Sequence, residues 1–311
     1  MHIPVLRDEI ETFFSFKENT VYVDCTVGLG GHLLSFIERI ATLKECVGID
    51  MDTAHLQIVK AKLDIDTHSK VEVHLVHSRF ENAKSVLENL NLKGKVTSIL
   101  LDLGICSTHV DHAERGFSFN KSGPLDMRFD ITSGLTAADI VNTFSEKDLT
   151  HILFEYGEEK RAKQIAALIL MQRKQQPFST TDDLSSLIAK HIPSFEKKHP
   201  ATRTFQALRI AVNGELKQIS HIMNDMYEIL APGGRVAVIS YHSLEDRIVK
   251  QSLKEYAKSC ICPLELPRCV CSRQPRMNIL TKKPIEPSFH EIQQNNRSRS
   301  AKLRVAEKSL Y

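Results

Sequence analysis

The sequence predicts an α/β fold: a mostly parallel, Rossmann-like sheet interrupted by a helical insertion. Short apolar strands alternate with helical patterns through the first hundred residues, and strands separated by helices of about 10–15 residues form parallel βαβ units. This alternation stops after Asp102 and resumes only at Gly234, with mostly helical patterns between them. We therefore expect one α/β domain built from two separated stretches of chain.

In the first stretch, three of the four predicted strands end in an aspartate. We predict strands at Val21–Asp24, Cys46–Asp50, Val71–Val76 and Val96–Asp102, and helical patterns at Leu33–Ile37, Ala54–Leu63 and Phe80–Leu90.

The insertion begins with a polar loop from Ser107 to Gly134 and continues with helices and no strand. A long amphipathic helix at Thr204–Leu230 then leads back to a strand at Gly234–Ser240. Two further short strands are expected near Met277–Leu280 and Lys302–Val305. The predicted organisation is an α/β domain at 1–106 and 205–311 around an insertion at 107–204. The insertion's helices are expected at Ala137–Phe144, Glu146–Phe154, Lys160–Gln172 and Thr181–Lys190.

The composition is typical of a soluble globular protein, with 42% hydrophobic and 25% charged residues. No apolar run approaches the roughly 20 residues that span a bilayer, and the first residues do not resemble a signal peptide, so we expect a cytoplasmic protein without a membrane partner. The net charge is only +3, but residues 273–311 carry nine Lys or Arg against three Glu. Such a segment attracts phosphate groups, although a solvated tail that aids solubility is the alternative.

A glycine turn at Asp24–His32 follows the first strand and precedes a helix. Ligands of open parallel sheets bind at the carboxyl ends of strands, and Asp50, at the end of the next strand, is placed to accept hydrogen bonds from ribose hydroxyls. A dinucleotide fingerprint would have a third glycine where Leu33 stands, which disfavours NAD. Together with Phe80 and Asp102 at further strand ends, the turn favours S-adenosylmethionine. For Asp50 or Asp102 alone, capping of a turn is the alternative.

Four of the seven cysteines lie within twelve residues: Cys260, Cys262, Cys269 and Cys271. In a chain without an export signal, such a cluster indicates metal binding or reduced thiols rather than a disulfide framework. In structural zinc sites, two to four residues usually lie between the two cysteines of a pair, whereas here only one residue lies between them. We therefore predict no metal site and expect reduced thiols, with a metal as the open alternative.

Further segments, spread over almost the whole chain, resemble the bacterial small-subunit ribosomal RNA cytosine-N4 methyltransferases. Besides the glycine turn, the segments that carry this resemblance are His2–Leu6, Asp111–Phe119, Gly123–Arg128, Tyr156–Glu159, His199–Arg209, Pro232–Gly234, Ser240–Arg247 and Arg297–Arg304. The resemblance implies a class I S-adenosylmethionine-dependent methyltransferase with an inserted helical domain. It implies methylation of the exocyclic N4 amine of a cytidine in the decoding region of 16S rRNA, within the small ribosomal subunit.

By matching positions, the resemblance also implies a set of cofactor contacts. His109 stands where the family usually has Gln, and Gly214 and Asn296 are smaller departures. The implied contacts are Gly30, Gly31, His32, Asp50, Phe80, Asp102 and His109.

The exocyclic amine of cytosine is a poor nucleophile, so a hydrogen-bond acceptor on its N–H assists attack. We expect Asp102 in this role, with His242 and Ser243 facing the same cleft; for His242, partnership with a loop carbonyl is the alternative. Methylation at C5 would instead need a cysteine nucleophile, for which Cys106 is the candidate. The family has serine at that position, which disfavours this chemistry.

An RNA base must leave its stack to be methylated, and aromatic and polar side chains hold it. Phe117, Phe119 and Arg128 are the candidates in the insertion, with ordinary packing as the alternative for the phenylalanines. Arg297, Arg299 and Lys302 are the candidates in the basic tail. Two other functions remain to be weighed: a catalytically silent RNA- or ribosome-binding factor and an NAD-dependent oxidoreductase. The oligomeric state, monomer or homodimer, is left open.

Overall fold

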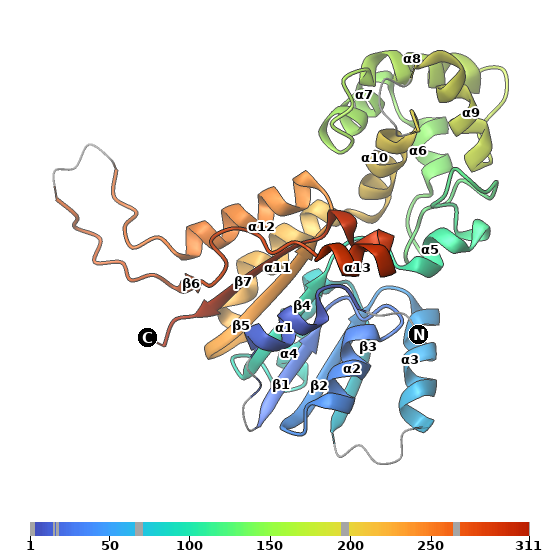
Figure 1. Ribbon diagram of the computed structural model, residues 1–311. Coiled ribbons are helices and arrows are strands. Elements are labelled where there is room, and N and C mark those ends of the chain that lie inside the picture. The colour runs from blue at the N-terminus through green and yellow to red at the C-terminus, as the bar shows by residue number, and fades with distance from the viewer. Residues whose placement is uncertain are drawn as a thin grey trace. The chain divides into compact units, whose positions relative to one another are not determined.

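The computed structural model describes residues 4–14, 16, 19–65, 71–193, 199–263 and 268–310. His2 and Ile3 of the segment His2–Leu6 lie outside this range. The chain forms two compact units, one from Met1–Gly104 with Leu216–Tyr311 and the other from Ile105–Glu215 (Figure 1).

The first unit contains a seven-stranded sheet in the order β3-β2-β1-β4-β5-β7-β6. The first five strands run parallel, whereas β7 is antiparallel to both β5 and β6. This confirms the predicted mostly parallel, Rossmann-like sheet. The strands are β1 (Thr20–Asp24), β2 (Leu43–Asp50), β3 (Glu72–His77), β4 (Val96–Asp102), β5 (Leu230–Ser240), β6 (Met277–Ile279) and β7 (Lys302–Lys308).

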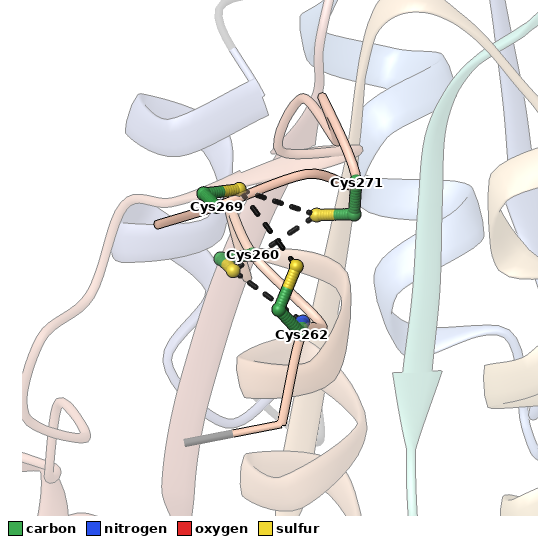
Figure 2. Close-up of side chains that lie close together, drawn as sticks. All are labelled: Cys260, Cys262, Cys269 and Cys271. Atoms are coloured by element: carbon green, nitrogen blue, oxygen red, sulfur yellow. Dashed lines mark hydrogen bonds between the residues drawn. The ribbon is translucent and has the colours of Figure 1, made fainter. Parts of the chain in front are cut away.

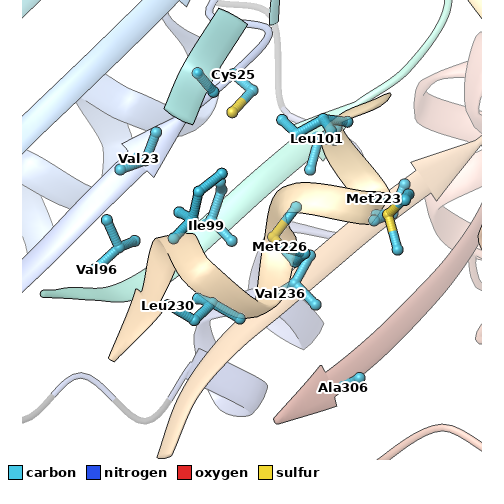
Figure 3. Packing of buried hydrophobic residues seen from close by; sticks show 14 of the residues in the cluster. Val23, Cys25, Val96, Ile99, Leu101, Met223, Met226, Leu230, Val236 and Ala306 are labelled. Atoms are coloured by element: carbon cyan, nitrogen blue, oxygen red, sulfur yellow. The ribbon is translucent and has the colours of Figure 1, made fainter. Parts of the chain in front are cut away.

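Helices cover both faces of this sheet, because alternate residues of a strand point to opposite faces. In β4, Ile99 and Leu101 enter one apolar cluster and Leu100 enters the other. The first cluster includes Met223 and Met226 of α11 (Figure 3). Its helices are α4 (Ala83–Asn89), α11 (Glu215–Ile229) and α12 (Ser243–Tyr256), and those of the other face are α1 (Arg7–Phe14), α2 (Gly31–Arg39) and α3 (Thr53–Ile65).

The second unit has its own apolar core and no named strand among its described residues. Thr136, Ser145 and Thr180 accept hydrogen bonds from backbone N–H groups at the starts of three of its helices, as helix caps do. The helices are α5 (Ser107–Asp111), α6 (Ala137–Thr143), α7 (Glu146–Glu155), α8 (Ala162–Arg173), α9 (Thr181–His191) and α10 (Thr202–Asn213).

The long helix expected at Thr204–Leu230 is two helices. Gly214 adopts a left-handed conformation with φ 64° and ends α10, after which α11 begins at Glu215. The predicted boundary at 204/205 thus falls inside α10, whose Phe205, Ala207 and Leu208 belong to the core of the second unit. The amphipathic periodicity continues across Gly214, so it indicated neither the end of α10 nor the boundary between the two units.

Short elements complete the structure. The loop predicted at Ser107–Gly134 contains α5 and a 3-10 turn, η2 (Ala113–Arg115), and η1 (Phe80–Asn82) precedes α4. Near the C-terminus, α13 (Phe289–Gln294) and η3 (Asn296–Ser300) precede β7. Among the described helices, none combines the length and apolar character needed to cross a bilayer.

Candidate active site

The strand order reverses between β1 and β4, and in open α/β sheets ligands bind at the carboxyl ends of the strands beside such a reversal. β1 ends at Asp24 and β4 at Asp102. The two strand ends are joined by the side chain of Thr26, whose hydroxyl accepts a hydrogen bond of 2.7 Å from the Asp102 backbone N–H. This edge of the sheet is therefore the candidate site, and we call it the reactive edge.

The glycine turn after β1 has the backbone conformations that its glycines permit. Gly30 has φ 81° and stands directly before α2, so a residue with a side chain would be strained there. A Cβ at Gly30 would also lie 2.9 Å from Leu34 Cδ1 and 3.0 Å from Val59 Cγ2. Glycine is therefore required at this position by both conformation and packing.

Asp50 holds the glycine turn in place. Its Oδ2 accepts a hydrogen bond of 2.6 Å from the Gly28 N–H, and its Oδ1 accepts one of 2.8 Å from the Asp52 N–H. Burial raises the pKa of Asp50, while these two N–H groups oppose the rise. Each carboxylate oxygen can accept a second hydrogen bond, so the predicted ribose contact is compatible with the structural role.

The Asp102 carboxylate is held between two side chains of the reactive edge. Tyr241, directly after β5, donates a hydrogen bond of 2.8 Å from its hydroxyl to Oδ1. The Nε2 atom of His32, on α2, lies 3.7 Å from Oδ2. Burial, followed by the charge of Asp102, raises the pKa of Tyr241 well above its ordinary value, so the phenol remains a donor at neutral pH. Asp102 is thus oriented and remains partly accessible.

Asp24 is a second carboxylate at this edge and is almost completely buried. Its oxygens accept hydrogen bonds from the Thr26 N–H at 3.1 Å and from the Tyr22 hydroxyl at 3.3 Å. Burial raises the pKa of Asp24 to about 6, with His32 opposing the rise and Asp102 adding to it. No arginine or lysine among the described residues pairs with it, and a buried acid without such a partner is costly, which indicates a role beyond stability.

The start of α12 is fixed by Glu245, which is fully buried. One of its oxygens accepts hydrogen bonds from the backbone N–H groups of Tyr241 at 2.7 Å and His242 at 3.3 Å. The other lies 3.0 Å from His242 Nε2. His242 thus lies at ion-pair distance from a carboxylate, and neither of its ring nitrogens makes a hydrogen bond among the described residues. Ser243 is exposed at the first position of the helix.

The antiparallel direction of β7 brings the basic tail to the reactive edge. Lys302, the first residue of β7, pairs with Ser240, the last residue of β5. The segment before it, η3, exposes Arg297 and Arg299. Arg304 is different, because its guanidinium binds Asp246 at 2.7 and 3.0 Å and is buried. Lys302 therefore lies at the end of β5, and Arg297 and Arg299 come shortly before it in the chain.

Phe80 lies in η1, after β3, and is partly buried against the core cluster that includes α4. The remaining predicted cofactor residue, His109, belongs to the second unit. Its ring lies 5.0 Å from the rings of both Phe117 and Phe129, and its Nδ1 accepts a hydrogen bond from the Cys106 N–H. His109 is thus part of an aromatic stack.

The three predicted base-holding residues make contacts within the second unit. Phe117 is buried in the core, and the Phe119 ring stacks on His199 at 4.7 Å. Arg128 forms a two-pronged ion pair with Asp126, at 2.9 and 2.8 Å. For the two phenylalanines the packing alternative describes the structure, and the Arg128 fork is already occupied by a carboxylate.

Sequence reasoning overlooked three residues of the reactive edge. Tyr241 and Glu245 were part of a quoted segment but had no assigned role, and Asp24 was regarded only as the start of the turn. Asp24 could have been found, because it ends a strand as Asp50 and Asp102 do. Nothing in the sequence could reveal that Tyr241 contacts Asp102, since 139 positions separate the two residues.

The residues of the reactive edge fit S-adenosylmethionine, which carries a cationic sulfonium and an ammonium group. Asp24, Asp50 and Asp102 supply negative charge at adjoining strand ends. Both ring nitrogens of His32 are buried and have no hydrogen-bond partner among the described residues, as expected of a side chain that faces a ligand.

Comparison with known proteins gives a consistent result. The model of the MraW methylase family matches residues 1–309. Proteins named ribosomal RNA small subunit methyltransferase H are similar over 99% of this chain. Those of Caldicellulosiruptor bescii and Caldicellulosiruptor saccharolyticus are 46% and 47% identical, with 99% of each relative covered, and that of Clostridioides difficile is 44% identical, with 98% covered. The chain therefore belongs to the MraW methylase family.

Proposed function

We propose that this protein transfers a methyl group from S-adenosylmethionine to the N4 amine of a cytidine in the decoding region of 16S rRNA. The observation that carries the proposal is the oriented carboxylate of Asp102 at the strand reversal, beside the glycine turn. The named activity of relatives that match the chain over 99% of its length supports it. Because bacterial ribosomal subunits assemble in the cytoplasm, we place the activity there.

The bound cofactor would supply an electrophilic methyl group, and the protein's task is to position the amine and accept its proton. Asp102 is the proposed acceptor. A hydrogen bond from the amine to its carboxylate would localise the nitrogen lone pair and provide a destination for the proton. Tyr241 fixes the carboxylate through Oδ1, which leaves Oδ2 as the oxygen directed to the amine.

His32 and His242 have different proposed roles. The Nε2 atom of His32 lies 3.7 Å from Oδ2 of Asp102. Its proposed role is to form a hydrogen bond with this carboxylate after a small movement. His242 is held by the buried Glu245 and would act by positioning the loop after β5. The exposed Ser243, Arg297 and Arg299 and the half-buried Lys302 are proposed to contact the RNA, since cations and hydroxyls bind phosphate and sugar oxygens.

The proposal is tested by incubating the protein and methyl-labelled S-adenosylmethionine with naked 16S rRNA, small subunits and whole ribosomes. The RNA is then digested to nucleosides and the label is identified. We expect N4-methylcytidine, with label depending on the RNA's assembly state. Label in 5-methylcytidine would favour the Cys106 alternative, and RNA binding without any transfer would favour the catalytically silent factor. Either result would overturn the proposal.

A further inference from the structure

The segment between α12 and β6 is a long excursion from the first unit, at the left of Figure 1. Its base is closed by a hydrogen bond of 2.8 Å from the Arg276 N–H to the Tyr256 carbonyl oxygen. Among its described residues, 257–263 and 268–276, none is buried. Each of the two units has a buried apolar core, but the described part of this excursion has no buried residue.

All four clustered cysteines nevertheless converge on one point of this excursion (Figure 2). The Sγ–Sγ distances are 4.0 Å for Cys262–Cys269, 3.6 Å for Cys269–Cys271 and 3.9 Å for Cys271–Cys260. All four sulfurs lie within 4.8 Å of one another. For a tetrahedral zinc ion with Zn–S bonds of about 2.3 Å, the edge of the sulfur tetrahedron is about 3.8 Å. The three distances match this edge and are far longer than a disulfide bond.

The surroundings of the sulfurs also fit thiolate ligands. The backbone N–H of Cys262 donates to Cys260 Sγ, and that of Val270 donates to Cys262 Sγ, both at 3.4 Å. Such N–H groups stabilise negative charge on sulfur. Ile261 and Val270, the residues between the cysteines of each pair, are 57% and 75% exposed. The excursion is therefore organised around the sulfurs rather than around its apolar side chains.

We propose that Cys260, Cys262, Cys269 and Cys271 bind one structural zinc ion. All four positions of the tetrahedron are occupied by protein, as in structural rather than catalytic zinc sites. The ion would replace the thiol protons, which leave to solvent, and would cross-link the outgoing and returning halves of the excursion. Zinc fits better than iron because methyl transfer needs no electron carrier. The one-residue spacing that disfavoured a metal is accommodated because each pair contributes one edge of the tetrahedron.

The test measures metal content in protein purified under reducing conditions without chelators. Elemental analysis is expected to find about one zinc per chain in the unaltered protein. The double variant Cys260→Ser/Cys271→Ser is expected to lose nearly all of it. Cys106→Ser, which removes a thiol outside the cluster, is the matched control and should keep the metal. Cobalt substitution should give the visible absorption of tetrahedral cobalt thiolate in the unaltered protein and the control only.

A second measurement has a readout that does not depend on metal analysis. Removal of zinc by a chelator should accelerate tryptic cleavage at Arg268 and Arg273 while the thermal unfolding of the first unit stays unchanged, because no described residue of the excursion belongs to its core. The proposal is overturned if the protein binds no zinc after anaerobic reconstitution, if it contains iron instead, or if titration under native conditions finds the four thiols paired as disulfides.

Discussion

The reactive edge of the first unit and the loop at residues 116–134 of the second unit differ in a way that is instructive. In both, residues were assigned to function from sequence. At the reactive edge, Asp24, Asp50 and Asp102 stand at adjoining strand ends, two of them at the reversal of strand order. In the loop, Phe117 is core and Arg128 is paired with Asp126. A parallel sheet dictates where strand ends meet, whereas a loop sequence does not reveal which of its side chains are buried.

Two buried or half-buried acids make the same contrast in electrostatic terms. Burial acts to raise the pKa of Asp126, but hydrogen bonds from Arg128 hold it below its ordinary value. Asp24 has no arginine or lysine beside it in the described part of the chain, and burial raises its pKa to about 6. In the second unit an arginine thus lowers the pKa of the acid, whereas at the reactive edge of the first unit burial keeps the pKa of Asp24 raised.

The largest effect is expected for Asp102→Asn. The amide oxygen can still accept the Tyr241 hydrogen bond, but the charge and the proton acceptor are lost, so the rate of methyl transfer should fall by about 10²–10⁴-fold. Single-turnover kinetics measure the rate, and calorimetry measures cofactor affinity. If the single-turnover rate at saturating cofactor were unchanged and only cofactor affinity fell, Asp102 would bind the cofactor without accepting the proton. Asp64→Asn, an exposed acid on α3, is the control and should leave both quantities unchanged.

For the second unit, Phe117→Ala should lower the free energy of unfolding by about 3 kcal/mol, because it opens a cavity beside His109 and Phe129. Chemical denaturation monitored by circular dichroism measures this. Phe154→Ala, which removes a ring that is 58% exposed, is the matched control and should cost much less. Unchanged stability together with weakened RNA binding would restore Phe117 as a base-holding residue.

Asp24→Asn should stabilise the protein at pH 7. The folded-state pKa of about 6 exceeds the ordinary 3.8, so the stability contribution of Asp24 is complete below about pH 3.8 and is lost as the pH rises through about 6. A shift of this size corresponds to about 2–3 kcal/mol for a buried group. Unfolding free energies measured from pH 4 to 8 should therefore diverge between the two proteins up to about pH 6 and run parallel above it. Parallel curves throughout would show that Asp24 is not perturbed.

The smallest effect is expected for the double variant Arg297→Ala/Arg299→Ala. Loss of two phosphate contacts should weaken RNA binding by about tenfold near physiological salt and reduce the slope of log affinity against log salt by about 1–2. Filter binding across a salt series measures both. Lys44→Ala/Lys60→Ala removes two exposed cations of the first unit, one in β2 and one in α3, and serves as the control. Equal losses in both variants would mean that η3 has no special role.

The alternation of strands and helices determined most of the first unit before its structure was known. Each predicted strand from Val21–Asp24 to Val96–Asp102 exists, with ends that differ by a few residues at most. Helical periodicity also located α6 to α9. It failed at Gly214, because the apolar pattern continues through a residue whose left-handed conformation ends α10. Local patterns record which side chains are buried but not where the chain turns.

The sequence by itself determined the sheet, the glycine turn, the acids at its strand ends and the family. These features are local, since hydrophobic period and glycine conformation act over a few residues. Only the tertiary structure decided which distant residues meet. It paired Tyr241 with Asp102 and Glu245 with His242, brought Lys302 to the end of β5 through an antiparallel strand, and gathered four cysteines around one point. Such contacts follow from strand order and chain direction, which no short segment of sequence encodes.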